Sequence, residues 1–353
     1  MRRIILARHG QPDFPVGAHL CLGRTDLPLS PLGRMQAALL GEELRPMKPT
    51  ANFTSPLLRC RCTAETLGQP FVIEEDLIEQ DMGSWDGLDF ETIKQRFPAL
   101  YEARGQNPLL VPAGAETLAQ VQARAVPALQ HCADACCGDF VVVTHASVIQ
   151  AIQAPVLQVP LAESRELRLP YGAYAVLLWN EGLRIETMKI SPHPLMTPDL
   201  AETLLAAAAP GQRVVAHCKA VAKKAGEIAD ALPLTLDRNA LICAALLHDV
   251  ARKERNHATV GADWVKTLGY GKEAELIRQH HDLESNILDE AAILYLSDKC
   301  VQEDKPVSIE ERFENSAARC MTAEAKAAHA RRYTAVKALQ AKVNTLCGRS
   351  VIL

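Results

Sequence analysis

The sequence has no apolar run that approaches the ~18 residues needed to cross a bilayer. The longest candidate, Ala240–Leu247, fits a buried helix better. Internal repeats and low-complexity tracts are also absent from the sequence. Hydrophobic residues make up 48% and charged residues 23% of the chain, which is ordinary for globular proteins. These features argue against a membrane protein, a disordered chain, a collagen and a coiled coil.

An excess of charge of one sign is missing too. The 42 acidic and 38 basic residues give a net charge of −4. We therefore expect no general surface for nucleic acid or for anionic membranes. A local basic pocket is compatible with this balance.

Signals for export and for disulfide pairing are weak as well. The apolar start of the chain ends at Arg8, too early for an export signal. We therefore expect a cytoplasmic protein whose eleven cysteines are reduced thiols. Cys132, Cys136 and Cys137 lie close together but have no second pair at metal-ligand spacing. We interpret these three as packing at the end of a helix.

The length of the chain predicts two domains, because 353 residues exceed the ~100–200 residues of an ordinary domain. Residues 191–198 contain three prolines in eight positions, which is typical of a linker. We place one domain at residues 1–192 and another at residues 199–353.

The first half alternates strands and helices. Continuous apolar strands separated by helices indicate a mainly parallel sheet covered on both faces, which is an α/β three-layer sandwich. The predicted strands are 3–7, 51–54 and 140–144, a closing hairpin is predicted at 174–179 and 183–190, and helices are predicted from Ser30-Pro31, around Arg59 and at 116–129.

After the linker we find only helical periodicity, which predicts an all-α domain. The expected helices are 199–209, 212–231, 237–250, 256–268, 272–281, 287–301 and 322–347.

A first group of candidate site residues follows the predicted strands. His9 comes directly after the first strand, and His145 comes directly after the Val-rich strand. Ligands of open α/β sheets bind beyond the carboxyl ends of the strands, so these two histidines can meet there. Arg8 and Arg59 add guanidinium groups that suit a phosphoryl group. A neutral imidazole can attack phosphorus, and Glu79 is a candidate donor of a proton to the leaving oxygen.

The ordered set of motifs resembles the histidine phosphatase superfamily, which includes cofactor-dependent phosphoglycerate mutases and α-ribazole phosphatase. Pro12 and Pro15 replace the Thr and Asn that family members often carry, and Ala146-Ser147 replaces small glycines. These departures leave the core of the site intact, but they bear on which substrate it binds. The matching segments are Arg8-His9-Gly10, Gly23–Gly33, Ser55–Glu65, Ile78–Gly87 and Val143–His145.

The resemblance implies a mainly parallel fold and a phosphatase that needs no cofactor. It implies that His9 is the phosphorylated nucleophile and Glu79 the proton donor, with Asp81 as a second candidate donor. Arg8, Arg59 and His145 would form the phosphate pocket, and Arg24 and Thr25 would lie near the substrate. The alternative is a phosphoglycerate mutase-type phosphotransferase joined to a regulatory module.

The helical half carries a second group, made of histidines and aspartates. Imidazole nitrogens and carboxylate oxygens suit Mn, Fe, Co, Ni, Zn or Mg, so ligand type does not select the metal. His248-Asp249 ends an otherwise apolar helix, where a charged pair is costly unless it is satisfied. Asp298 likewise ends an apolar run.

This second set resembles the HD superfamily of metal-dependent phosphohydrolases. The resemblance implies a divalent metal held by His217, His248, Asp249 and Asp298. It also implies that His257 and His280 bind a second metal or the substrate phosphate, with Arg252 meeting a phosphate. His281 has no clear role.

Together the two resemblances predict a bifunctional phosphohydrolase that acts on phosphorylated small molecules. The second domain would cleave a phosphate ester or anhydride, and a nucleotide is one candidate substrate. In the alternative, this domain senses a nucleotide without turnover. The oligomeric state is left open.

Overall fold

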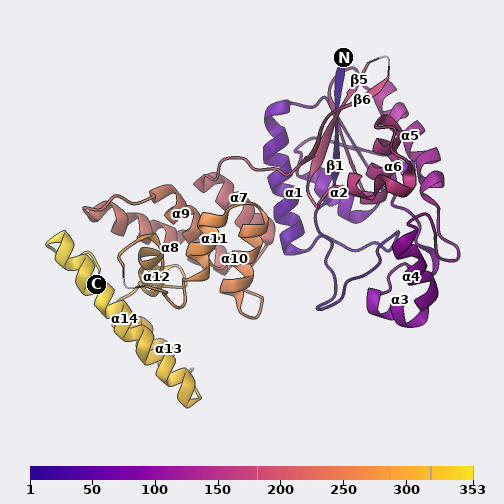
Figure 1. Ribbon diagram of the computed structural model, residues 1–353. Helices are drawn as coiled ribbons and strands as arrows, with labels where there is room; N and C mark the ends of the chain where they lie inside the picture. The colour runs from indigo at the N-terminus through magenta and orange to yellow at the C-terminus, as the bar shows by residue number, and fades with distance from the viewer. Residues whose placement is uncertain (181, 286, 319, 353) are drawn as a thin grey trace. The chain divides into compact units, whose positions relative to one another are not determined.

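A computed structural model describes residues 1–180, 182–285, 287–318 and 320–352 (Figure 1). The chain divides into two compact units, residues 1–194 and 195–353. Leu353, with which the predicted second domain ends, lies outside the described residues.

The first unit is built on a six-stranded sheet with the order β3-β2-β4-β1-β5-β6. Neighbouring pairs from β3 to β1 are parallel, whereas β5 pairs antiparallel with β1 and with β6. The predicted mainly parallel sheet with its closing hairpin is therefore confirmed. The strands are β1 (Arg2–Arg8), β2 (Ala51–Thr54), β3 (Val72–Ile73), β4 (Phe140–Thr144), β5 (Tyr174–Trp179) and β6 (Leu183–Ile190).

Successive side chains of the central strands belong alternately to two separate apolar cores. Ile4 and Val142 belong to a core shared with α5 (Leu118–Asp134) and α6 (Ala146–Val156). Ile5 and Val143 belong to a core shared with α1 (Pro31–Leu44) and α2 (Leu58–Glu65). Figure 1 shows these helix pairs on opposite faces of the sheet. Burial on both faces explains why the strands are continuously apolar.

A smaller helical element lies beside the sheet. It contains α3 (Phe90–Arg96) and α4 (Pro98–Gln106), which the periodicity analysis did not predict. Cys21, Trp85 and Ile93 form its own small core. Short 3-10 turns complete the first unit at Arg45–Met47, Glu75–Leu77, Gly83–Trp85 and Leu161–Leu167.

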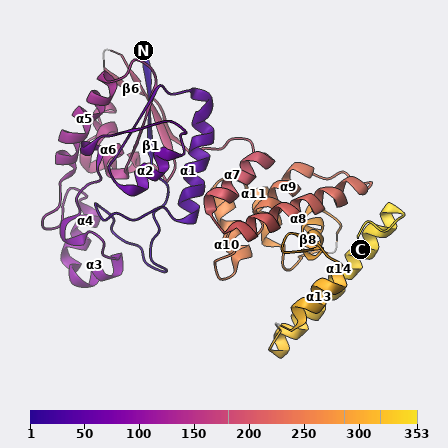
Figure 2. The same ribbon diagram turned by 180° about the vertical axis from the view of Figure 1, so that it is seen from behind.

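The second unit is helical, as expected (Figure 2). Two features differ from the expectation of helices alone. A short antiparallel pair, β7 (Val301–Gln302) and β8 (Lys305–Pro306), follows the helix that ends at Lys299, and the helix at Ile309–Ala317 was not predicted. The helices are α7 (Pro198–Ala208), α8 (Gln212–Ala231), α9 (Arg238–Leu247), α10 (His257–Thr267), α11 (Gly271–Arg278), α12 (Glu290–Lys299), α13 (Ile309–Ala317) and α14 (Ala323–Cys347). Across the described residues, each helix is too short or too polar to span a membrane.

Candidate active sites

His9 and His145 meet at the carboxyl edge of the sheet. Their strands are parallel neighbours, and Arg8 is paired with Thr144 in the ladder, so the next residue of each strand emerges at the same place. The two imidazole centroids are 5.0 Å apart. Both side chains are buried. The juxtaposition expected from the strand order is therefore present.

The His9 ring is held as a neutral imidazole with one defined tautomer. Its Nδ1 donates to the carbonyl of Gly10 over 2.7 Å, which leaves the lone pair on Nε2. Burial, and then the positive charges of Arg59 and Arg8, hold the pKa of His9 well below its ordinary value of 6.5. An unprotonated nitrogen in a cationic pocket is the form that can attack phosphorus.

Two arginines frame this imidazole. Arg59 is buried, and its terminal nitrogens donate to the carbonyls of Thr25 (3.0 Å) and Gly23 (2.7 Å). Arg8 donates to the carbonyl of Leu169 over 2.7 Å, and its guanidinium lies 3.8 Å from the centroid of the Tyr171 ring. The nearest partners are thus backbone carbonyls and an aromatic face, and the carboxylate of Asp26 lies 3.9 Å from Arg59. Carbonyls and a ring orient the guanidinium groups and leave most of their charge available to an anion.

His145 has partners that sequence reasoning did not single out. Its Nε2 lies 2.7 Å from the hydroxyl of Ser55 and 3.4 Å from the thiol sulfur of Cys60. Burial first, and then the charge of Arg59, holds the pKa of His145 well below 6.5. A signal for Ser55 was available, because it follows β2 directly, and β2 is the parallel neighbour of β4.

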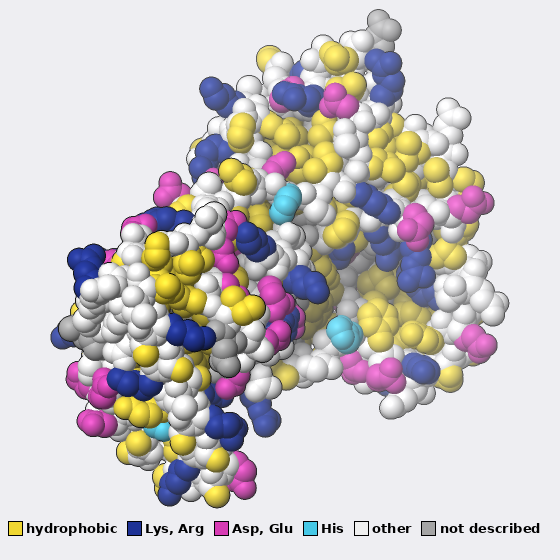
Figure 3. Space-filling model, turned by 60° about the vertical axis from the view of Figure 1, so that its left-hand side comes forward, with side chains coloured by type: hydrophobic (Ala, Val, Ile, Leu, Met, Phe, Trp, Pro, Cys, Tyr) yellow, Lys and Arg dark blue, Asp and Glu magenta, His cyan; other side chains and the backbone are white. Residues whose placement is uncertain are grey.

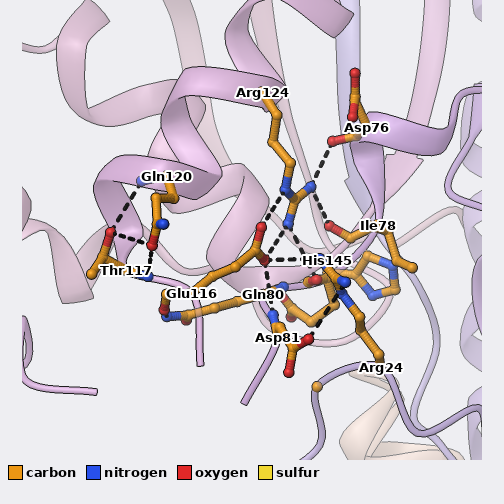
Figure 4. A network of polar contacts seen from close by, with 12 residues as sticks. Arg24, Asp76, Ile78, Gln80, Asp81, Glu116, Thr117, Gln120, Arg124 and His145 are labelled. Carbon is orange, nitrogen blue, oxygen red and sulfur yellow. Dashed lines mark hydrogen bonds and ion pairs between the residues drawn. The ribbon is translucent and has the colours of Figure 1, made fainter. Parts of the chain in front are cut away.

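Glu79 lies on a segment that Arg124 of α5 holds through hydrogen bonds, and Figure 4 shows Arg124 with Asp76 and Ile78 of this segment. Its side chain is buried, and one carboxylate oxygen accepts the backbone N–H of Gln80 over 2.8 Å. Arg124 donates to the carbonyls of Asp76 (2.6 Å), Ile78 (2.7 Å) and Glu79 (3.2 Å). These bonds fix the backbone that carries the Glu79 carboxyl.

Glu116 connects Arg124 with Arg24, the arginine expected near the substrate. Its carboxylate pairs with Arg124 at 3.0 Å and with Arg24 at 3.1 Å (Figure 4). Arg24 also pairs with Asp81 at 3.4 Å. Arg24 is thus occupied by two carboxylates, and Thr25 contributes its carbonyl to Arg59. In this structure Arg24 binds the segment that follows Glu79, and Thr25 orients Arg59.

In the second unit, three histidines are oriented in the same way, by a hydrogen bond from Nδ1 to a backbone carbonyl. The Nδ1 atoms of His217, His248 and His280 donate to backbone carbonyls at 2.7, 2.8 and 2.7 Å. This fixes the tautomer, so each Nε2 is left as a lone-pair donor. Among the residues that the structure describes, no hydrogen-bond partner reaches the buried Nε2 atoms of His248 and His280 or the buried Oδ1 of Asp249. Buried, unpartnered donor atoms of this kind fit a metal ion.

The carboxylates divide these ligands into two groups. Oδ1 of Asp298 lies 3.1 Å from Nε2 of His217 and 3.7 Å from Nε2 of His248. Oδ1 of Asp249 lies 3.1 Å from Nε2 of His257 and 3.7 Å from Nε2 of His280. The other oxygen of Asp249 lies 3.8 Å from His248. The six predicted ligands therefore converge, with Asp249 between two sets.

His281, to which the sequence assigned no role, lies at the same centre. Its Nε2 is 2.9 Å from Nε2 of His257, and His257, His280 and His281 offer ring nitrogens close enough to hold one ion. Arg252 lies beside them, with a guanidinium nitrogen 2.8 Å from Nε2 of His257. Consecutive histidines after a helix were the available signal.

A cavity of about 550 Å³ opens onto these ligands. Among the described residues, its basic lining side chains outnumber its carboxylates. Part of the wall comes from α13 and α14. The basic lining residues are Arg213, Arg252, Lys299, Arg312 and Arg332, and the acidic ones are Asp249, Asp298 and Glu303.

Comparison with known proteins places both units in families. The model of the histidine phosphatase superfamily (branch 1) matches residues 4–190, and the HD domain model matches residues 214–302. A glucosyl-3-phosphoglycerate phosphatase of Mycobacterium tuberculosis is 33% identical over 174 residues, which cover 46% of this chain and 78% of that protein. A metal-independent phosphoserine phosphatase of Arabidopsis thaliana is 32% identical over 164 residues, covering 44% and 68%.

Solved structures agree with the sequence comparison. The mycobacterial glucosyl-3-phosphoglycerate phosphatase in complex with VO3 superposes with a TM-score of 0.50 at 28% identity, over 54% of this chain and all of that one. HD domains are metal-dependent, and the His/Asp groups of the second unit provide ligands for a metal. The chain belongs to the histidine phosphatase superfamily and carries an HD domain after its phosphatase domain.

Proposed function

We propose that residues 1–192 form a phosphomonoesterase that works through a phosphohistidine on His9. The supporting observation is the His9 ring itself, which has its proton on Nδ1 toward Gly10 and a pKa lowered by burial and by the nearby charges of Arg59 and Arg8. Nε2 attacks phosphorus and the bond from phosphorus to the ester oxygen breaks, while Glu79 protonates that oxygen. Water then attacks the phosphohistidine, Glu79 recovers a proton, and inorganic phosphate leaves.

The other candidate residues receive supporting roles. Arg8, Arg59 and His145 bind the phosphoryl oxygens and spread the charge of the transition state. Water is the final acceptor in this proposal, and the similar proteins of known activity are phosphatases. A mutase would instead return the phosphoryl group to a substrate oxygen and would depend on a bisphosphate primer. Release of inorganic phosphate without such a primer separates the two.

The nucleophile is tested with the full chain in the presence of a chelator. His9→Ala should abolish both phosphate release and the acid-labile phosphoenzyme formed with labelled substrate. His131→Ala is a matched control, because His131 is exposed and pairs with Glu74 away from the site. Phosphate release that persists in the chelated His9→Ala chain would contradict the covalent mechanism.

The proton donor is tested through the leaving group. Glu79→Gln should slow alkyl phosphates about 100-fold or more, because alkoxides are poor leaving groups. Aryl phosphates, which leave without a proton, should be slowed far less. Equal losses on both classes would reject Glu79, and Asp81→Asn would then be measured in the same way.

For the second unit, residues 199–353, we propose metal-dependent hydrolysis of a phosphate ester or anhydride, with a nucleotide as the candidate substrate. His217, His248, Asp249 and Asp298 would hold one ion, and Asp249, His257 and His280 a second. A bound divalent ion neutralises phosphate charge and activates water. Arg252, beside Asp249, and the other basic side chains of the cavity would bind the phosphate chain.

A panel of phosphodiesters and nucleoside polyphosphates tests this proposal. Asp249→Asn should abolish turnover and reduce metal content, whereas Asp263→Asn should change neither. Asp263 is an exposed residue of the same unit that pairs with Arg278. Full metal loading and nucleotide binding without turnover would instead favour the regulatory alternative.

A further inference from the structure

The cavity beside Glu79 contains more positive charge than one phosphoryl group requires. It measures about 480 Å³, and among the described residues four arginines and a single acidic side chain line it. Arg8 belongs to the candidate phosphate pocket. The other three arginines, Arg104, Arg165 and Arg168, have no part in the proposed phosphoryl chemistry.

Arg168 is held in place by a buried relay. Its Nε donates to Oε1 of Gln150 over 2.7 Å, and Nε2 of Gln150 donates to the Ser164 hydroxyl over 2.7 Å. Gln150 is 1% exposed and Ser164 is 0% exposed. The neutral relay positions the guanidinium at the cavity wall and does not itself offset the positive charge.

The three arginines reach the cavity from two directions. Arg165 and Arg168 come from the 3-10 turn at Leu161–Leu167 and the residue after it, whereas Arg104 comes from α4. Within the part of the chain that the structure describes, none of the three forms an ion pair with a carboxylate. Burial, and then the charges of Arg168 and Arg165, lower the pKa of Arg104. Grouped guanidinium groups repel one another unless an anion joins them.

Several arginines outside this cavity have carboxylate partners. Arg3 pairs with Asp139 at 2.7 Å, and Arg238 pairs with Asp230 at 2.7 Å. Over the face drawn in Figure 3, basic and acidic side chains lie interspersed. In the cavity, by contrast, four arginines gather with a single acidic side chain among the described residues, and this local excess of positive charge indicates a site for an anion.

We propose that Arg104, Arg165 and Arg168 bind a second anionic group of the substrate, apart from the phosphoryl group that is transferred. The substrates would then be small phosphomonoesters that also carry a carboxylate or a second phosphate. Guanidinium forks bind both of these anions through paired N–H donors. The inference rests on the proposed function of this unit, because it uses the same cavity.

The apolar part of the cavity wall fits this assignment. Met82, Trp85, Phe90 and Tyr101 line the cavity together with the arginines. Apolar and aromatic side chains accept the carbon skeleton that joins two anionic groups, and the charged groups at either end fix its orientation. A phosphomonoester without the second anion would leave the three arginines unpaired.

Calorimetry on the full chain tests the proposal. The protein carries His9→Ala so that ligands are not consumed, and a chelator removes metal from the second unit. Two pairs of probes differ by one anionic group: 3-phosphoglycerate against glycerol 3-phosphate, and fructose 1,6-bisphosphate against fructose 6-phosphate. At least one doubly anionic member should bind about tenfold or more tightly than its partner. The pair that shows this preference identifies the second anion as carboxylate or phosphate.

Variants locate the preference. Arg168→Gln should reduce it to within about twofold while the singly anionic member keeps its affinity. Arg184→Gln, on the exposed side of β6, is the matched control and should retain it. If Arg168→Gln does not fold, Arg104→Gln takes its place. Equal affinities within both pairs overturn the proposal, as does a preference that survives loss of both arginines.

The binding result is independent of turnover. If the wild-type chain hydrolyses no phosphomonoester but the calorimetric preference is present and depends on Arg168, the proposed function fails and the second-anion site stands. If turnover through His9 is found and the preference is absent, the second-anion site fails alone.

Discussion

Arg124 of α5 donates a hydrogen bond of 3.2 Å to the backbone carbonyl of Glu79. The same guanidinium also holds the carbonyls of Asp76 and Ile78. A helix on one face of the sheet thereby sets the position of a carboxyl at the edge of the sheet. Arg124 itself is a positioning residue, because it acts on the peptide backbone.

Arg124→Lys should keep the positive charge but lose the planar guanidinium group. A single ammonium group cannot make all three hydrogen bonds to the carbonyls of this segment. We expect kcat for alkyl phosphates to fall about tenfold with KM changed less than about twofold, because misplacing a catalytic group costs rate more than binding. Aryl phosphates should lose less. Arg45→Lys, on an exposed arginine of the same unit, is the control. An unchanged kcat would show that Glu79 is held by other contacts.

The stability of the first unit should decrease as pH falls below about 6.5, the ordinary pKa of histidine. The pKa values of His9 and His145 are well below 6.5 in the folded unit, mainly through burial. In this range the unfolded chain therefore binds more protons than the folded one, and falling pH favours unfolding. Replacement of either histidine by Asn should make the free energy of unfolding less dependent on pH.

The measurement is urea unfolding of the chelated full chain between about pH 5 and pH 7, followed by tryptophan fluorescence. Trp264→Phe removes the tryptophan of the second unit and leaves Trp85 and Trp179 as probes of the first. His131→Asn serves as the exposed control. Identical pH dependence in His145→Asn and the parent would contradict buried, neutral imidazoles.

Metal loading of the second unit should reach about two ions per chain, because Asp249 lies between two ligand sets. His257→Ala should remove one ion, and His217→Ala should weaken the other. Chelation should lower the melting temperature of the second unit and leave the first unchanged, since a ligand that binds only the folded state stabilises it. Metal analysis and calorimetry measure both effects. One ion in the wild type would reject the two-centre assignment.

The turn after β1 should tolerate no side chain at Gly10. A Cβ there would lie 2.1 Å from the carbonyl oxygen of Gly33, and a Cβ at Gly33 would lie 2.0 Å from the carbonyl oxygen of Gln11. Gly10→Ala should destabilise the first unit by about 1–3 kcal/mol or more, because backbone must move. A Cβ at Gly105 would meet no atom of the described residues within 4 Å, so Gly105→Ala is the control in thermal unfolding. Equal melting temperatures would contradict the tight contact.

The meeting of His9 and His145 could be predicted from the sequence. Each histidine directly follows an unbroken apolar strand, and parallel pairing brings the carboxyl ends of strands to one edge of the sheet, however many residues separate them. His248, Asp249 and Asp298 could be predicted from their places at the ends of apolar runs. His217, His257 and His280 were candidate ligands only through the resemblance to the HD superfamily.

Other parts of the site depend on tertiary contacts that leave no periodic signal. Arg24 was expected near the substrate, but its partners Asp81 and Glu116 lie far along the chain and could not be identified from spacing. Arg104 comes from α4, a short helix whose amphipathic pattern is too weak to recognise. His281 stands beside His280 in the sequence, but its contact with His257, which makes it a candidate ligand, depends on the fold of the turn after α11.

Cys60 is packed against His145, so its thiol can report when the edge of the sheet that carries His145 opens. Burial raises the pKa of this thiol far above its ordinary value, so it remains protonated and hidden while the sheet edge is intact. An alkylating reagent can reach it only when the strands and α2 separate. The rate at which Cys60 is alkylated, read by mass spectrometry against the exposed Cys137, therefore reports how often this edge opens in solution.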